Sequence, residues 1–274
     1  MATLSMTALT RSVGAIVEGI DLSEALDADT VGAVREAVLD RGVLFFRGQD
    51  ISREEMLAFM ERFGTPCTDP FAVVERPPPA LSTVIDNPTL NYRKATAVWH
   101  TDSSLAEAPA SLMSLRALEL PPVGGDTCWG SMYAAYDALS EPIRNMLDGL
   151  SAVHSAFKVL PLMKDAGYPA LKEDMRNVHP VVRVHPETGR KALFVNELWT
   201  EKIVGLDDVE SKHLLAMLFE HIASPLFTVR WRWQVNDVAF WDNRAFQHYA
   251  VRDYDETRVM QKSLLAGDRP YGPN

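Results

Sequence analysis

The sequence predicts an α+β fold in which an antiparallel sandwich or jelly roll forms the core and helices pack outside it. Three observations support this fold class. Many short apolar or alternating segments, typical of strands, are spread along the chain. Segments with helical spacing are fewer, and they gather near the start and in the middle. The 274 residues, 47% of them hydrophobic, are enough for a sizeable core.

The expected strands are short apolar runs or segments in which apolar and polar side chains alternate. Residues 227–233 show this alternation clearly, because two tryptophans, a valine and a phenylalanine alternate with polar residues. The Pro-Glu-Thr-Gly turn at residues 186–189 joins two strands as a hairpin. The expected strands lie in residues 13–22, 43–46, 81–85, 111–118, 181–184, 192–195, 227–233, 238–241 and 259–266.

The expected helices are marked by capping signals as well as by the spacing of apolar residues. The first ends at Gly42, a residue type that favours helix ends. The second opens with a capping box formed by Ser52 and Glu55. The fourth is amphipathic and has aspartates at its start. The expected helices span residues 29–40, 52–63, 132–147 with a break at Pro142, and 207–221.

Charge and cysteine content limit the classes of function. The formal net charge is −10 without any basic tract, which argues against a nucleic-acid partner. Cys67 and Cys128 form no CxxC motif, so a reducing compartment fits better than a disulfide framework. The N-terminus has no signal-peptide pattern, and no apolar run reaches membrane-spanning length. With no clean break or repeat, residues 1–274 are expected to form one cytoplasmic domain without a membrane partner.

Two segments far apart in the sequence together contain the ligand types of an iron site. Residues 99–102 read Trp-His-Thr-Asp, and His248 ends the segment Trp-Asp-Asn-Arg-Ala-Phe-Gln-His. The spacing of His100 and Asp102 fits a strand end or turn, where alternate side chains point the same way. Asp102 alone would also suit a turn or cap. Two histidines and one carboxylate cover one face of a metal and leave the other open.

Five motifs carry a resemblance to a known family. They are Trp-His-Thr-Asp at 99–102, Gly-Gly-Asp-Thr at 124–127, Phe-Val-Asn-Glu at 194–197, Arg-Trp-Arg-Trp at 230–233 and Trp-Asp-Asn-Arg-x-x-Gln-His-Tyr-Ala at 241–250. In this order, over nearly the whole chain, they resemble the taurine dioxygenase (TauD/TfdA) family of iron(II)- and 2-oxoglutarate-dependent dioxygenases. The resemblance implies a double-stranded β-helix, or jelly roll, with flanking helices. It also implies Fe(II) as cofactor, 2-oxoglutarate and O2 as co-substrates, and a homodimer or homotetramer.

The resemblance also assigns roles to residues of the motifs. His100, Asp102 and His248 match the iron ligands of the family. Thr127 matches a threonine whose hydroxyl contacts 2-oxoglutarate.

Two basic residues four positions apart bind the carboxylate ends of 2-oxoglutarate in the family. Arg258 matches the first, but the second, normally arginine, is Lys262 here. Lysine offers a point charge instead of a planar fork, so we expect weaker or shifted binding of 2-oxoglutarate. Arg258 binding the distal carboxylate alone is the fallback, and a changed oxoacid preference is a further alternative. Both residues could also be solvated surface charges.

Substrate contacts are predicted from the family's substrate loop and from nearby aromatic and basic residues. Asp69 and Ala72 stand where the taurine enzyme has its histidine and tyrosine contacts, so taurine is not the expected substrate. The candidate contacts are Phe71, Arg93, Lys94, Thr96, Phe157 and Trp199. Ordinary core packing would equally explain Phe71 and Trp199.

The expected reaction is hydroxylation of a small, largely apolar or aromatic organic anion, either a carboxylate, a sulfate or a sulfonate. Two alternatives remain. One is an iron and oxygen enzyme of this fold that does not use 2-oxoglutarate, which only Lys262 favours. The other is a non-catalytic sensor that binds the metal or the oxoacid.

Overall fold

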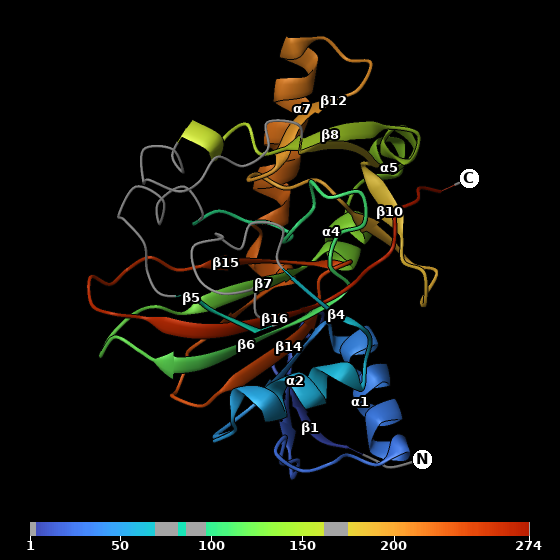
Figure 1. Ribbon diagram of the computed structural model, residues 1–274. Helices are drawn as coiled ribbons and strands as arrows, with labels where there is room; N and C mark the ends of the chain where they lie inside the picture. The colour runs from blue at the N-terminus through green and yellow to red at the C-terminus, as the bar shows by residue number, and fades with distance from the viewer. Residues whose placement is uncertain (1–3, 69–81, 86–96, 162–174, 274) are drawn as a thin grey trace.

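The computed structural model of the chain describes residues 4–68, 82–85, 97–161 and 175–273. In this part of the chain the strands form one eight-stranded sheet, two three-stranded sheets and one two-stranded sheet. Helices lie on the outside of these sheets (Figure 1).

The large sheet takes strands from both ends of the chain. Its hydrogen-bonded order is β1-β2-β3-β14-β6-β16-β4, and β5 also pairs with β16. Neighbouring strands are antiparallel except β2 and β3, which are parallel. The strands are β1 (Ser5–Ala8), β2 (Ala15–Glu18), β3 (Val43–Phe46), β4 (Pro66–Cys67), β5 (Ser82–Ile85), β6 (Leu112–Glu119), β14 (Val238–Asp242) and β16 (Val259–Leu265).

A three-stranded antiparallel sheet, in the order β13-β7-β15, faces the large sheet across the main hydrophobic core. In that core the ring of Trp129 from β7 contacts Phe45 from β3 and Trp241 from β14, with centroid separations of 5.3 and 5.8 Å. These strands are β7 (Thr127–Ser131), β13 (Thr228–Trp231) and β15 (Phe246–Ala250). The two facing layers, with helices outside, confirm the predicted α+β jelly-roll fold.

The strands of the large sheet separate two cores, because successive side chains of a strand point to opposite faces. In β3, Val43 and Phe45 lie in the jelly-roll interior, whereas Leu44 and Phe46 pack against the first two helices. These are α1 (Ala28–Arg41) and α2 (Arg53–Glu61), which cover the outer face of the sheet (Figure 1). The interior face is the one that meets the candidate site.

Helix ends follow the predicted capping signals. Helix α1 ends at Gly42 with a φ of 76°, and Ser52 and Glu55 form the capping box of α2. The predicted break at Pro142 is wrong in detail, because the break comes earlier and Pro142 lies in the first turn of the next helix. Proline is tolerated there, since that N–H has no partner in the helix. The helices are α4 (Met132–Asp137), α5 (Glu141–Asp148) and α7 (Asp208–Ile222).

The remaining strands form two small sheets beyond the jelly roll. One has the order β12-β8-β9, and the other is the predicted hairpin of β10 and β11. These elements are β8 (Ser151–Ser155), β9 (Arg176–Pro180), β10 (Val182–Val184), β11 (Lys191–Leu193), β12 (Thr200–Ile203) and the 3-10 helix η1 (Pro225–Phe227). Among the described residues, each helix is too short or too polar to span a bilayer.

Candidate metal centre and oxoacid site

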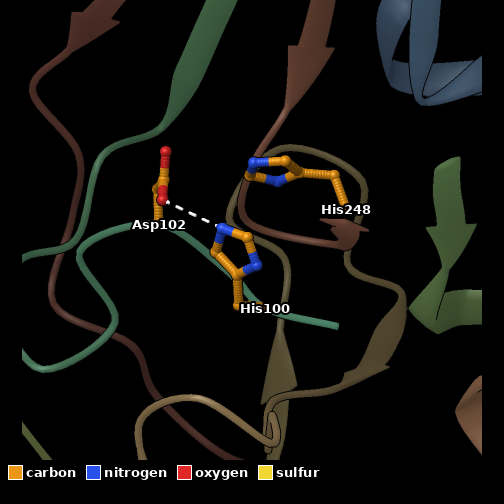
Figure 2. A group of neighbouring side chains, drawn as sticks. All are labelled: His100, Asp102 and His248. Atoms are coloured by element: carbon orange, nitrogen blue, oxygen red, sulfur yellow. Dashed lines mark ion pairs between the residues drawn. The ribbon is translucent and has the colours of Figure 1, made fainter. Parts of the chain in front are cut away.

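Strand pairing brings His100 and His248 together. His248 lies in β15, and His100 forms an isolated antiparallel bridge with it. In this bridge each backbone N–H donates to the carbonyl of the other residue, at 3.0 and 2.9 Å. Asp102 follows in a turn, and the ligand atoms of the three side chains lie within 4.8 Å of one another (Figure 2). The structure therefore brings together the three residues predicted to bind the metal.

Hydrogen bonding orients the ring of His100. Its Nδ1 lies 2.8 Å from the carbonyl oxygen of Val98, which can only accept, so Nδ1 carries the proton. The lone pair is therefore on Nε2, which lies 3.4 Å from Oδ1 of Asp102. Figure 2 shows the three side chains arranged around one point, although His248 comes from a segment far from His100 and Asp102 in the sequence. This fixed tautomer is the one that a metal at this point requires.

The protonation states of His248 and Asp102 fit a divalent cation. Burial, with the neighbouring His100, lowers the pKa of His248 to about 3, which keeps its ring neutral. Burial alone would raise the pKa of Asp102. The positive charge of Lys262, together with the neighbouring His100 and His248, outweighs burial and holds that pKa well below its usual value. Neutral imidazole and ionised carboxylate are the forms that bind metal. Nδ1 of His248 is also buried without a hydrogen-bond partner among the described residues.

Lys262 reaches the same carboxylate from β16. Its Nζ lies 3.3 Å from Oδ2 of Asp102, and both side chains are largely buried. Lys262 lies between Met260 and Leu264, two residues of the jelly-roll core, and alternation puts all three on one face. The amine therefore lies at the metal end of the interior.

Arg258 is a buried cation beside Thr127. The residue is 5% exposed, and it donates from Nε to the carbonyl oxygen of Gly125 and from Nη2 to Oγ1 of Thr127, at 2.9 and 3.1 Å. Oγ1 of Thr127 also accepts a hydrogen bond of 3.0 Å from Trp233. In the described parts of the chain, no carboxylate forms an ion pair with Arg258. Burial, which the interaction with Tyr254 offsets only in part, lowers its pKa to about 10. Such a group favours an anionic ligand, because a buried cation without a counter-ion is costly.

The alternative that Arg258 and Lys262 are solvated surface charges is wrong for both side chains. Arg258 is buried, and Lys262 is an interior neighbour of Asp102.

The Gly-Gly-Asp turn before Thr127 holds Arg258 in place. Gly124 and Gly125 have φ values of 84° and 74°, a region that disfavours other residues. A Cβ on Gly124 would also lie 2.5 Å from Oδ1 of Asp253. The N–H of Gly125 donates to that carboxylate at 2.9 Å, and its carbonyl accepts from Arg258. The Gly-Gly-Asp turn therefore does two things: it reverses the chain, and it positions the buried side chain of Arg258.

The predicted substrate contacts are only partly within the described residues. Phe71, Arg93, Lys94 and Thr96 lie outside them, as do Asp69 and Ala72. Trp199 is 6% exposed and packs in a small cluster with Leu105, Ala156, Val159 and Leu198. Phe157 is 40% exposed, near the end of β8. A role for either side chain in substrate binding stays a prediction.

Three polar residues of the last motif, Asp242, Asn243 and Arg244, have no role predicted from the sequence. Asp242 accepts hydrogen bonds from His185 and Arg244, and Asn243 bonds to the backbone of Asp102. The sequence shows only three consecutive polar residues shortly before His248, and the structure shows that all three are buried.

Comparisons with known proteins agree with this geometry. A family model described as "Taurine catabolism dioxygenase TauD, TfdA family" matches residues 5–264. The chain is 37% identical to a protein named alkylsulfatase from Acinetobacter baylyi, over 97% of this chain and 86% of that protein. It is 38% identical to an alpha-ketoglutarate-dependent sulfate ester dioxygenase from Pseudomonas putida, over 95% and 88%. The crystal structure of a taurine dioxygenase from Burkholderia xenovorans superimposes with a TM-score of 0.85 at 37% identity, over 99% of this chain and 92% of that one.

Proposed function

Because this chain belongs to the TauD/TfdA family and is an iron(II)- and 2-oxoglutarate-dependent dioxygenase, we propose that it hydroxylates a small, largely apolar or aromatic organic anion other than taurine. The observation that supports this chemistry at the site is the buried His-Asp-His set together with Arg258, a buried cation that forms no ion pair with a carboxylate among the described residues. The two alternatives, an enzyme without 2-oxoglutarate and a non-catalytic sensor, find no support among the relatives described above.

His100, Asp102 and His248 are the proposed ligands of iron(II). The bound metal supplies the activation of dioxygen that couples decarboxylation of 2-oxoglutarate to succinate with hydroxylation of the substrate. Trp129 and Trp241 pack around His248, with ring centroids 6.4 and 5.1 Å away. These indoles restrict the imidazole and exclude water from its flank.

Arg258 and Thr127 are the proposed partners of the distal carboxylate of 2-oxoglutarate. The support is that Arg258 lacks a carboxylate partner among the described residues and that Thr127 lies beside it. Lys262 is proposed to neutralise the carboxylate at the metal end, because its Nζ already lies next to Asp102. Arg258 would then bind one end of 2-oxoglutarate, and Lys262 would bind the other.

Replacing Lys262 by alanine tests this division. We expect Lys262→Ala to raise the 2-oxoglutarate Michaelis constant by about tenfold or more, because a hydrogen bond to a charged group contributes about 1.5–3 kcal/mol. The constant for the organic substrate should change far less, and Lys262→Arg should keep activity or tighten 2-oxoglutarate. Succinate release at varied 2-oxoglutarate measures both effects. An unchanged 2-oxoglutarate Michaelis constant would show that Lys262 interacts with Asp102 but does not bind 2-oxoglutarate.

A sulfate ester is the preferred member of the proposed substrate class. The support is that two relatives, each aligned over at least 95% of this chain, are named for action on sulfates or sulfate esters. Hydroxylation of the carbon that bears the ester oxygen gives an adduct that collapses to an aldehyde and inorganic sulfate. Phe157 and Trp199, with Phe71, Arg93, Lys94 and Thr96 from outside the described residues, remain the proposed contacts.

Substrate-dependent succinate release tests the proposed function. With iron(II), 2-oxoglutarate and oxygen, we expect stimulation by hexyl sulfate and by an aryl-bearing carboxylate, but hardly any by taurine. Hexyl sulfate should yield inorganic sulfate in equal amount to the succinate that it induces. Robust sulfite release from taurine would contradict the substrate class, while leaving the assignment to the family intact.

Three further properties are proposed on more general grounds. Residues 1–274 are proposed to act as one domain, since the family model covers most of them. A homodimer or homotetramer is proposed from the resemblance to the family. A cytoplasmic location is proposed because Cys67 and Cys128 form no disulfide with each other, as suits a reducing compartment.

A further inference from the structure

Asn243 holds both peptide groups of Asp102 with one side chain. Its Oδ1 accepts the backbone N–H of Asp102 at 3.1 Å, and its Nδ2 donates to the carbonyl oxygen of Asp102 at 3.0 Å. The same Nδ2 donates to the carbonyl oxygen of Ala110 at 2.9 Å. Asn243 is fully buried, so water does not compete for these bonds.

Ser103 also forms a hydrogen bond to the backbone of Asp102. Its Oγ donates to the carbonyl oxygen of Asp102 at 2.7 Å and accepts from the N–H of Ala110 at 2.9 Å. Both lone pairs of that carbonyl are therefore engaged. Ser103 has a φ of 56°, which is uncommon for a residue other than glycine and persists only where the surroundings enforce it. The turn that carries the proposed metal ligand is thus held by side chains.

The segment that presents Asn243 is itself rigidly anchored. The carboxylate of Asp242 accepts three hydrogen bonds from Arg244 and one from His185, all between 2.6 and 3.0 Å. Arg244 also donates to Glu187, in the hairpin that follows β10, at 2.7 Å. Asn243 is therefore fixed on both of its sides before it contacts Asp102.

We propose that Asn243 is a positioning residue that sets the direction of the Asp102 carboxylate, so that it meets His100 and His248 at one metal ion. The inference rests on the proposed role of the triad as metal ligands. Groups that orient a ligand typically change metal affinity by about 10- to 100-fold when they are removed. Asn243 acts through the backbone of Asp102, so its effect should appear in metal binding before any reaction with oxygen.

Asn196 offers a matched control within the same protein. It is an equally buried asparagine, and its side chain bonds to the same loop, one residue beyond Ser103. Nδ2 of Asn196 donates to Oγ of Ser104 at 3.0 Å, and its Oδ1 accepts the N–H of Trp199 at 2.9 Å. Asn196→Ala should therefore cost stability, as Asn243→Ala does, without releasing the backbone of Asp102.

Anaerobic titration of the metal-free full chain with Co(II) tests the proposal, with the Tm of each variant measured alongside. We expect Asn243→Ala to raise the dissociation constant about 10- to 100-fold and to alter the visible spectrum of bound Co(II). Asn196→Ala should stay within about threefold of the wild type. Equal losses of affinity in the two variants, or wild-type affinity in Asn243→Ala, would overturn the proposal.

Ser103→Ala keeps the test decisive if Asn243→Ala does not fold. It removes one of the two donors to the Asp102 carbonyl, so affinity should fall in the same direction by a smaller factor. Wild-type affinity in Ser103→Ala would then count against the proposal. A wild-type chain that binds no Co(II) would contradict the proposed metal centre itself, which separates that failure from a failure of the role of Asn243.

Discussion

His248→Ala is expected to lose turnover completely and to retain little iron, while the fold stays intact. His248 supplies one of three ligands, and its burial and low pKa keep the ring in the metal-binding form. Removing it leaves His100 and Asp102 as two ligands, too few for the facial arrangement. Iron content after anaerobic loading and succinate release measure the effect. The same result is expected for alanine at His100 or Asp102.

His154→Ala is the matched control for this prediction. His154 is also fully buried, and burial lowers its pKa to about 3 as well, but its Nδ1 bonds to Oγ of Ser104 at 3.1 Å instead of facing the triad. This variant should lose stability and keep its iron. Wild-type iron and turnover in His248→Ala would refute the assignment of the triad.

Arg258→Met is expected to raise the 2-oxoglutarate Michaelis constant by roughly 100-fold or more. Removing one partner of a buried charge pair costs about 3–5 kcal/mol, and each 1.4 kcal/mol corresponds to about tenfold in binding. Thr127 would be left as a single hydroxyl against the carboxylate. Succinate release at varied 2-oxoglutarate measures the constant, and iron content should be unchanged.

Arg116→Met separates loss of this binding role from loss of a buried arginine in general. Arg116 is buried to a similar degree, and burial lowers its pKa, but it bonds to the carbonyl of Ile51 and to Asn236. This variant should be destabilised with an unchanged 2-oxoglutarate constant. If Arg258→Met also kept its 2-oxoglutarate constant, the distal carboxylate would have to bind elsewhere.

The parts of the fold that local chemistry determines could be predicted from the sequence. The capping box at Ser52 and the glycine at the end of α1 are local signals, and both have the predicted geometry. β15 was not predicted as a strand, because its first three residues are all buried and include Gln247 and His248, so no alternation marks it. The structure nevertheless pairs His248, in β15, with His100.

Residue types and the family resemblance predicted which residues belong to the site, but not which residues they contact. The sequence places Lys262 in the last expected strand and Arg258 directly before it, but the neighbour of each depends on long-range packing. Lys262 meets Asp102, which lies 160 positions earlier in the chain. The bonds of Asn243 to Asp102 and Ala110 join segments more than 130 positions apart. No local pattern encodes such distances, so the role of Asn243 emerges only from the folded chain.

The two hydrogen bonds accepted by Thr127 determine the polarity of the proposed oxoacid site. Arg258 and Trp233 occupy both lone pairs of Oγ1, so the hydroxyl proton must point away from them. Thr127 and Arg258 then offer only hydrogen-bond donors, and no acceptors, to the proposed oxoacid. An oxoacid that ended in an amide would turn its own N–H groups toward these donors, whereas a carboxylate meets them with lone pairs alone. We therefore expect the proposed site to favour an acid over its amide of equal size.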